Sequence, residues 1–129
     1  MGAGVDAIEV SFGLGGDFMQ RPVGKQATAE NEKPWFRERA AALKRAVSVP
    51  VAVVGGIRSF DMAREILGAG DADLISMSRP FIREPKLISR WLAGDRRPAR
   101  CITCLQCYRL MLGNQDVLDT YCWQEARAG

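Results

Sequence analysis

Three short runs of hydrophobic residues along the chain predict buried β-strands. They are Asp6–Phe12, Val49–Gly55 and Asp73–Ser78. The middle run is apolar and β-branched almost throughout, and polar residues do not alternate within it. This pattern is typical of a strand that is covered on both faces within a parallel sheet.

Helical patterns separate and follow these runs. Pro34–Val47 has apolar residues at helical spacing and a proline suited to a first turn. Ser59–Ala69 begins with a serine N-cap and ends before Gly70, and a further helix is expected over about Glu84–Ala93. Because strands and helices alternate, the sequence predicts an α/β fold built of right-handed βαβ units around a parallel sheet.

The chain also carries signs of being part of a larger unit. Residues 2–11 resemble residues 68–78 once a single insertion is allowed, so the helix-to-strand unit is used at least twice. The first residues look like the end of a helix, and three parallel strands leave two open edges. We therefore expect residues 1–94 to be the C-terminal piece of a larger barrel or sheet, and residues 95–129 to form a cysteine-rich tail.

Composition narrows the class of protein. The 129 residues are 47% hydrophobic and 26% charged, which is ordinary for one globular domain of modest size. No apolar run approaches the roughly 20 residues that cross a bilayer, and the start lacks the features of a secretory signal. We therefore expect a cytoplasmic protein with no membrane partner, in which cysteines are reduced thiols or metal ligands.

The charge balance leaves two interpretations of one segment. The net charge of +3 is too small to imply nucleic acid, which we do not expect as a partner. Residues 83–109, however, carry seven basic residues against two acidic ones. This segment is either a solvated helix face or a docking site for an anionic partner. The absence of histidine excludes Ser–His, Cys–His and His–metal chemistry from this chain.

Two strand ends have features of a phosphate site. Gly55 and Gly56 follow the middle strand and precede the serine-capped helix, where the backbone can approach an anion closely. Ser78 and Arg79 follow the third strand and offer backbone amides beside a guanidinium. Either loop alone also fits an ordinary turn. Together, at one edge of a parallel sheet, they match the phosphate site formed after the last two strands of (β/α)8 barrels.

The four cysteines form a spaced set. Cys101, Cys104 and Cys107 have the spacing C-x2-C-x2-C, and Cys122 follows after 14 residues. A thiolate at every third residue lets one short segment supply three ligands of an iron–sulfur cluster, with the remote cysteine as the fourth. All-thiolate sites also suit zinc, although zinc usually pairs two C-x2-4-C units. Iron–sulfur, zinc and unmetallated thiols remain as alternatives.

A family resemblance rests on these segments. GVDAIEVS, DADLISMSRPFIREP and the following CITCLQC resemble the C-terminal third of the old yellow enzyme family, nearest the branch of 2,4-dienoyl-CoA reductase and trimethylamine dehydrogenase. The resemblance implies an FMN-binding (β/α)8 (TIM) barrel to which this chain contributes the last three βα units. It places the FMN phosphate against Gly55, Gly56 and the backbone of Ser78 and Arg79. It further implies a 4Fe-4S cluster that exchanges single electrons with the flavin.

The implied activity is hydride transfer through FMN between NAD(P)H and a small molecule such as an unsaturated carbonyl. The catalytic residues would lie on earlier strands outside this chain. The long loop over residues 13–33 would lie over the flavin, so Phe18, Met19 and Arg21 are candidates for substrate contact. Expected partners are the upstream barrel and a redox partner or further C-terminal domain. The alternatives are another phosphate-binding barrel enzyme, an isomerase or lyase, and a metal-stapled binding module.

Overall fold

A three-stranded parallel sheet forms the centre of the computed structural model, which describes residues 4–11, 33–108 and 120–128. The strands β1 (Ile8–Val10), β2 (Val51–Val54) and β3 (Leu74–Ser76) lie in sequential order. Ile8 pairs with Val51, and Ala52 pairs with Leu74. The three predicted strands and their parallel direction are confirmed, although each strand is shorter than its hydrophobic run.

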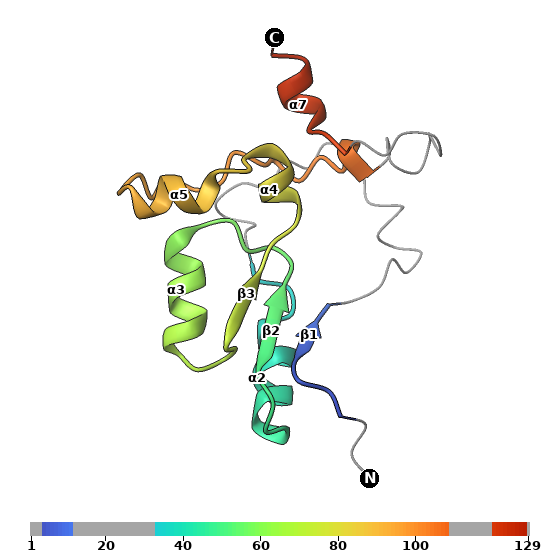
Figure 1. Cartoon of the computed structure of the whole chain (residues 1–129), viewed down its shortest axis with the longest axis vertical. Coiled ribbons are helices and arrows are strands. Elements are labelled where there is room, and N and C mark those ends of the chain that lie inside the picture. Colours follow the sequence, from blue (N-terminus) through green and yellow to red (C-terminus); the bar gives the residue numbers. More distant parts are fainter. Residues whose placement is uncertain (1–3, 12–32, 109–119, 129) are drawn as a thin grey trace.

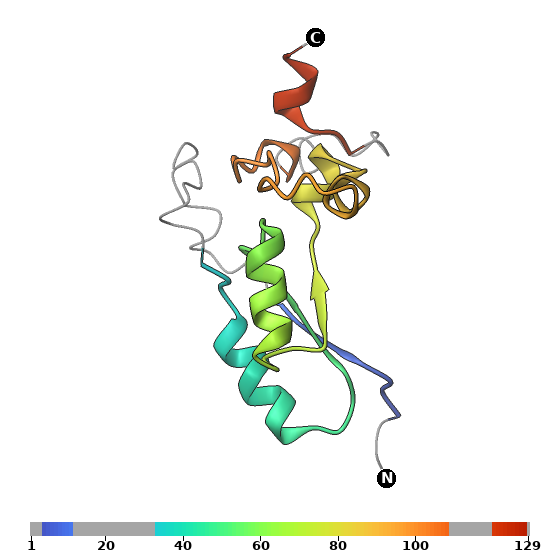
Figure 2. The same cartoon turned by 90° about the vertical axis from the view of Figure 1, so that its left-hand side faces the viewer.

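Two helices connect the strands as the pattern predicts. Helix α2 (Arg37–Ala46) lies between β1 and β2, and helix α3 (Phe60–Gly68) lies between β2 and β3. The hydroxyl of Ser59 accepts a hydrogen bond of 3.2 Å from the amide of Met62, which confirms this serine as the N-cap of α3. Because both crossovers join neighbouring strands in the same direction, both helices cover the same face of the sheet (Figures 1 and 2).

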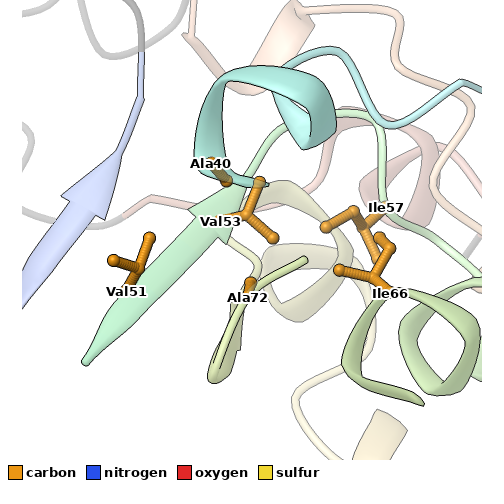
Figure 3. Packing of buried hydrophobic residues seen from close by; sticks show 6 residues of the cluster. All are labelled: Ala40, Val51, Val53, Ile57, Ile66 and Ala72. Carbon is orange, nitrogen blue, oxygen red and sulfur yellow. The ribbon is translucent and has the colours of Figure 1, made fainter. Parts of the chain in front are cut away.

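The main core lies between this face and the two helices. It consists of small and β-branched side chains, shown in Figure 3: Ala40, Val51, Val53, Ile57, Ile66 and Ala72. Val51 and Val53 are fully buried, whereas the alternate residues of β2 are only half-buried. Within residues 4–11, 33–108 and 120–128, the expected cover of β2 is therefore complete on one face only.

The third predicted helix is shorter in the structure than in the prediction. The helix expected over about Glu84–Ala93 is present as α5 (Leu87–Leu92), and a separate short helix that was not predicted, α4 (Arg79–Arg83), precedes it with a break between the two. The break follows from Pro85, because a proline disfavours helical geometry at the residue before it. Glu84 accordingly has φ −132° and ψ 81°. A further short helix, α7 (Trp123–Ala126), was not predicted.

A second, smaller core attaches the residues after α5 to the sheet. Leu87, Trp91 and Ala99 are buried together, and Phe60 packs against Trp91 in an edge-to-face arrangement. The indole of Trp91 donates a hydrogen bond of 3.0 Å to the carbonyl oxygen of Arg97. Residues 97–99 therefore lie against α5 rather than extending from it.

Both outer strands leave hydrophobic surface uncovered by the residues that the structure describes. Leu74 on β3 is 53% exposed, and Val5 before β1 is 56% exposed. This small α/β arrangement fits part of a (β/α)8 barrel. In the same described segments, no helix has both the length and the apolar composition needed to cross a membrane.

Candidate functional site

A pocket lies where β2 and β3 end, on the side of the sheet that also carries α4 and α5 (Figure 1). It is lined by residues from three segments: Val54–Arg58, Ser76–Pro80, and the pair Cys101 and Thr103. The structure therefore brings together all four residues predicted for phosphate binding, Gly55, Gly56, Ser78 and Arg79. Cys101 and Thr103, at the start of the cysteine segment, line the same pocket.

The glycine pair has a backbone that other residues rarely adopt. Gly55 has φ +102° and Gly56 has φ +75°. A Cβ on Gly56 would overlap the carbonyl oxygen of Lys33, and one on Gly55 would lie 3.0 Å from the ring of Phe36. The amide of Trp35 donates a hydrogen bond of 3.1 Å to the carbonyl oxygen of Gly55. Glycine is therefore required at both positions, because the segment before α2 approaches their backbone too closely for a larger residue.

Arg79 supplies positive charge to the pocket. Its guanidinium lies over the ring of Trp35, with 5.6 Å between the guanidinium carbon and the ring centroid. Its Nη1 atom is buried and has no hydrogen-bond partner among the described residues. A buried donor without a partner is costly, and an anion would offset that cost. The residues present therefore fit a bound phosphate group.

Ser78 contributes to this site through its backbone position. It is the N-cap residue of α4, yet its hydroxyl makes no capping hydrogen bond. Its carbonyl oxygen accepts hydrogen bonds from the amides of Phe81 at 2.9 Å and Ile82 at 3.2 Å. The main chain at residue 78 is therefore set by the start of α4 and not by the serine side chain.

Arg58 joins the pocket to the first cysteine. Its carbonyl oxygen accepts a hydrogen bond of 2.8 Å from the amide of Ala99, and its guanidinium donates one to the carbonyl oxygen of Cys101. Beyond Cys101, Thr103 and Leu105 have φ angles of +55° and +61°. Such left-handed backbone is uncommon outside glycine and is often found at functional sites.

The cysteines share one environment without forming a recognisable metal site. Burial raises the pKa of the Cys107 thiol, and the charges of Cys101 and Cys104 raise it further, while Arg79 acts in the opposite direction. The amide nitrogen of Gln124 lies 3.7 Å from the sulfur of Cys104, which brings the segment of Cys122 alongside. All four thiols are free and partly buried. Across residues 4–11, 33–108 and 120–128, no three Cys, His, Asp or Glu side chains are grouped as metal ligands.

Sequence reasoning missed two residues of this site. Arg58 stands two positions after the glycine pair, so its place in the loop was a usable signal. Trp35 was assigned to a helix, and nothing in the sequence shows that it lies before α2 and beneath Arg79. The candidates for substrate contact, Phe18, Met19 and Arg21, fall outside the described residues.

The fold and the pocket together define an α/β protein with a pocket at the carboxyl ends of parallel strands, as in part of a (β/α)8 barrel. Residues 5–96 match the model of the NADH:flavin oxidoreductase / NADH oxidase family, and the chain belongs to this family. The predicted relationship to the old yellow enzyme family is thereby confirmed.

Two relatives have names that agree with this assignment, and a third is a different kind of enzyme. The chain is 34% identical over 105 residues to a metal reductase of Desulforamulus reducens, covering 81% of this chain and 15% of that protein. It is 30% identical over 103 residues to an NADH oxidase of Thermoanaerobacter brockii, and the match covers 79% of this chain and 15% of that protein. The chain thus spans about 15% of the length of these relatives. It is also 42% identical over 64 residues to the imidazole glycerol phosphate synthase subunit HisF of Campylobacter lari, covering 50% of this chain and 24% of that subunit.

Proposed function

We propose that this chain supplies the FMN phosphate site of an FMN-dependent NADH oxidoreductase whose other strands complete a (β/α)8 barrel. The observation that carries the proposal is the pocket itself. It joins the left-handed glycine pair after β2 to Ser78 and Arg79 after β3, and Arg79 has a buried guanidinium nitrogen with no partner among the described residues. Membership in the NADH:flavin oxidoreductase family supports FMN as the ligand.

The residues of the pocket would divide the binding as follows. Backbone amides at Gly56, Ser78 and Arg79 would donate to the phosphate group, and the Arg79 guanidinium would neutralise its charge. Trp35 holds that guanidinium in place through its ring face. When bound, FMN supplies hydride chemistry that no side chain of this chain provides.

The reaction we propose transfers hydride from NADH or NADPH through FMN to a small molecule such as an unsaturated carbonyl. The branch nearest 2,4-dienoyl-CoA reductase and trimethylamine dehydrogenase is part of this proposal. The catalytic residues are expected on strands outside this chain. Phe18, Met19 and Arg21 remain candidates for substrate contact. We propose a cytoplasmic location. The proposed partners are the upstream barrel and a redox partner or a C-terminal domain.

The cysteine segment would add one-electron chemistry to the flavin site. We propose that Cys101, Cys104, Cys107 and Cys122 bind a 4Fe-4S cluster, and zinc or unmetallated thiols are the alternative outcomes. Support comes from the donor set and from the shared environment of the first three thiols. Since the thiols are not grouped as ligands in this structure, no electron-transfer step is derived from them.

The FMN proposal is tested by titrating the apo form of the full-length protein with FMN while recording flavin fluorescence. Arg79→Gln should weaken FMN binding by roughly tenfold or more, because a charge-assisted hydrogen bond contributes about 1.5–3 kcal/mol. Ser78→Ala is the matched control, because it keeps the backbone amide, and it should bind FMN like the wild type. Equal affinity of Arg79→Gln and wild type, or loss of binding in Ser78→Ala, would contradict this assignment.

The similarity to HisF over half of the chain favours a second candidate, a barrel enzyme that acts on a phosphorylated metabolite. Such an enzyme would use the same strand-end loops for phosphate and would contain no flavin. Absorbance of the purified full-length protein separates the two, because only a flavoprotein shows the yellow colour and releases FMN on denaturation. A colourless protein that fails to bind added FMN would favour this second candidate or the metal-stapled binding module.

A further inference from the structure

Both cysteine-bearing segments are attached to helix α4 through one arginine. The guanidinium of Arg83 donates a hydrogen bond of 2.8 Å to Oε1 of Glu125 and one of 2.5 Å to the carbonyl oxygen of Arg100. Arg100 directly precedes Cys101, and Glu125 lies three residues after Cys122. A single side chain therefore contacts the segments on either side of the stretch that separates Cys107 from Cys122.

Neighbouring charges complete this arrangement. The buried carboxylate of Glu84 accepts hydrogen bonds from the amide of Arg100 at 2.6 Å and from the guanidinium of Arg90 at 3.0 Å. The guanidinium of Arg100 in turn lies 3.3 Å from Oε2 of Glu125. We refer to Arg83, Glu84, Arg100 and Glu125 as the α4 charge network. In Figures 1 and 2, α4, α5 and α7 all lie on the side of the sheet where β2 and β3 end.

The environment of Arg83 makes its contacts more than a surface ion pair. Its side chain is only 17% exposed, so water screens the pair with Glu125 less than it screens a fully exposed pair. The pair of Arg97 and Asp95 offers a contrast. Arg97 is 82% exposed, and its partner stands two residues away in the same segment, so that pair joins no distant parts of the chain.

We propose that Arg83 is a positioning residue that holds the segment of Cys122 against the segment of Cys101 and Cys104 before any metal binds. The contact of 3.7 Å between Gln124 and Cys104 fits this arrangement. Without Arg83, the segment of Cys122 would have to be ordered beside the other cysteine segment at the moment of metal binding, which costs conformational entropy. The inference rests on the proposed function only in naming a metal as the thiols' ligand.

The test is a double-mutant cycle in the full-length protein with Arg83→Gln, Glu125→Gln and both together. Arg97→Gln is the control, because it removes an arginine from the same basic segment without separating distant parts. The first readout is amide hydrogen exchange of α7 in metal-free protein, where the amide of Ala126 donates to the carbonyl oxygen of Cys122. The second is titration with Co²⁺ under anaerobic conditions, which reports thiolate ligation by its absorbance.

Each single variant should speed exchange in α7 and weaken Co²⁺ binding by about 10–100-fold, the usual range for residues that orient metal ligands. The effect of the double variant should be smaller than the sum of the two single effects, because both substitutions remove the contact between Arg83 and Glu125, although each also breaks a separate bond to Arg100. Unchanged exchange of α7 in both single variants would overturn the inference. If wild type binds no Co²⁺ while α7 still responds to both variants, the positioning role stands and the metal part of the proposed function fails.

Discussion

The guanidinium of Arg58 donates a hydrogen bond to the carbonyl oxygen of Cys101, so the loop after β2 and the first cysteine share a direct contact. The carbonyl oxygen of Arg58 accepts a second bond of 2.8 Å from the amide of Ala99. Arg58 and Cys101 also line the same pocket. The proposed phosphate site and the thiol segment are therefore neighbouring parts of one surface.

Replacing Arg58 should loosen this connection. Arg58→Gln removes a guanidinium bond to a partly buried carbonyl oxygen, so we expect the free energy of unfolding to fall by about 1–3 kcal/mol. Hydrogen exchange should rise over residues 99–105 in particular. Arg64→Gln, on the exposed side of α3, is the control. Equal protection of residues 99–105 in both variants would mean that the contact does not order the thiol segment.

Gly56 should tolerate substitution less well than another glycine with the same backbone. Gly56 has φ +75° and Gly70 has φ +72°, so an alanine at either site pays a similar conformational cost of about 1 kcal/mol. At Gly56 the added Cβ would also overlap a backbone atom, the carbonyl oxygen of Lys33, whereas at Gly70 it would meet no atom of the described residues within 4 Å. Gly56→Ala should therefore lower the free energy of unfolding by roughly 3 kcal/mol or more.

Urea denaturation of Gly56→Ala and Gly70→Ala in the full-length protein measures this difference. FMN affinity should fall in Gly56→Ala as well, because the amide of Gly56 would have to move. Gly56→Val should release FMN altogether. Similar losses of stability in the two alanine variants would show that the approach of Lys33 is not what requires glycine.

The pattern of residues predicted more of the fold than of the site's surroundings. The strands were found because runs such as Val51–Val54 have no competing helical period, and Ser59 was found because capping is a local interaction. Pro85 was a local signal that Glu84 lies outside the helix, because a proline disfavours helical geometry at the residue before it. Long-range contacts could not be predicted in this way. Arg79 lies over Trp35, and Arg83 donates a hydrogen bond to Glu125. Each pair is more than 40 positions apart in the sequence, so no local pattern indicates it.

Asp73 should make the stability of the sheet depend on pH in the acid range. Lys44 and the amide of Val51 donate hydrogen bonds to its carboxylate, with Lys44 the larger cause, and they hold the pKa of Asp73 below its ordinary value of 3.8. A lowered pKa in the folded state means that the unfolded chain binds the proton first as pH falls. The stabilising effect is therefore present above pH 3.8 and is lost as pH falls below it.

Asp73→Asn tests this by comparing melting temperatures at neutral pH and across the acid range. The variant should melt below wild type at neutral pH, and the two should converge as pH falls through the lowered pKa. Asp6→Asn, at an exposed site before β1, is the control. A difference between Asp73→Asn and wild type that stays constant with pH would show that the loss comes from packing and not from the carboxylate's charge.

The four thiols should act as one unit if they bind a cluster. Each of Cys101→Ser, Cys104→Ser, Cys107→Ser and Cys122→Ser should then lose most of the metal and the order of the segment after Gly94 together, because ligation and local folding are coupled. Three thiolates brought together without a bound cation repel one another. Partial loading of the serine variants is therefore not expected.

Anaerobic reconstitution of the full-length protein with iron and sulfide, followed by iron and zinc analysis, decides the identity of the metal. About four irons per chain would support a cluster that exchanges electrons with FMN. One zinc would make the segment structural, since zinc has no redox chemistry. No metal in wild type would leave four ordinary thiols, and the flavin would then have to take its electrons directly from the nicotinamide.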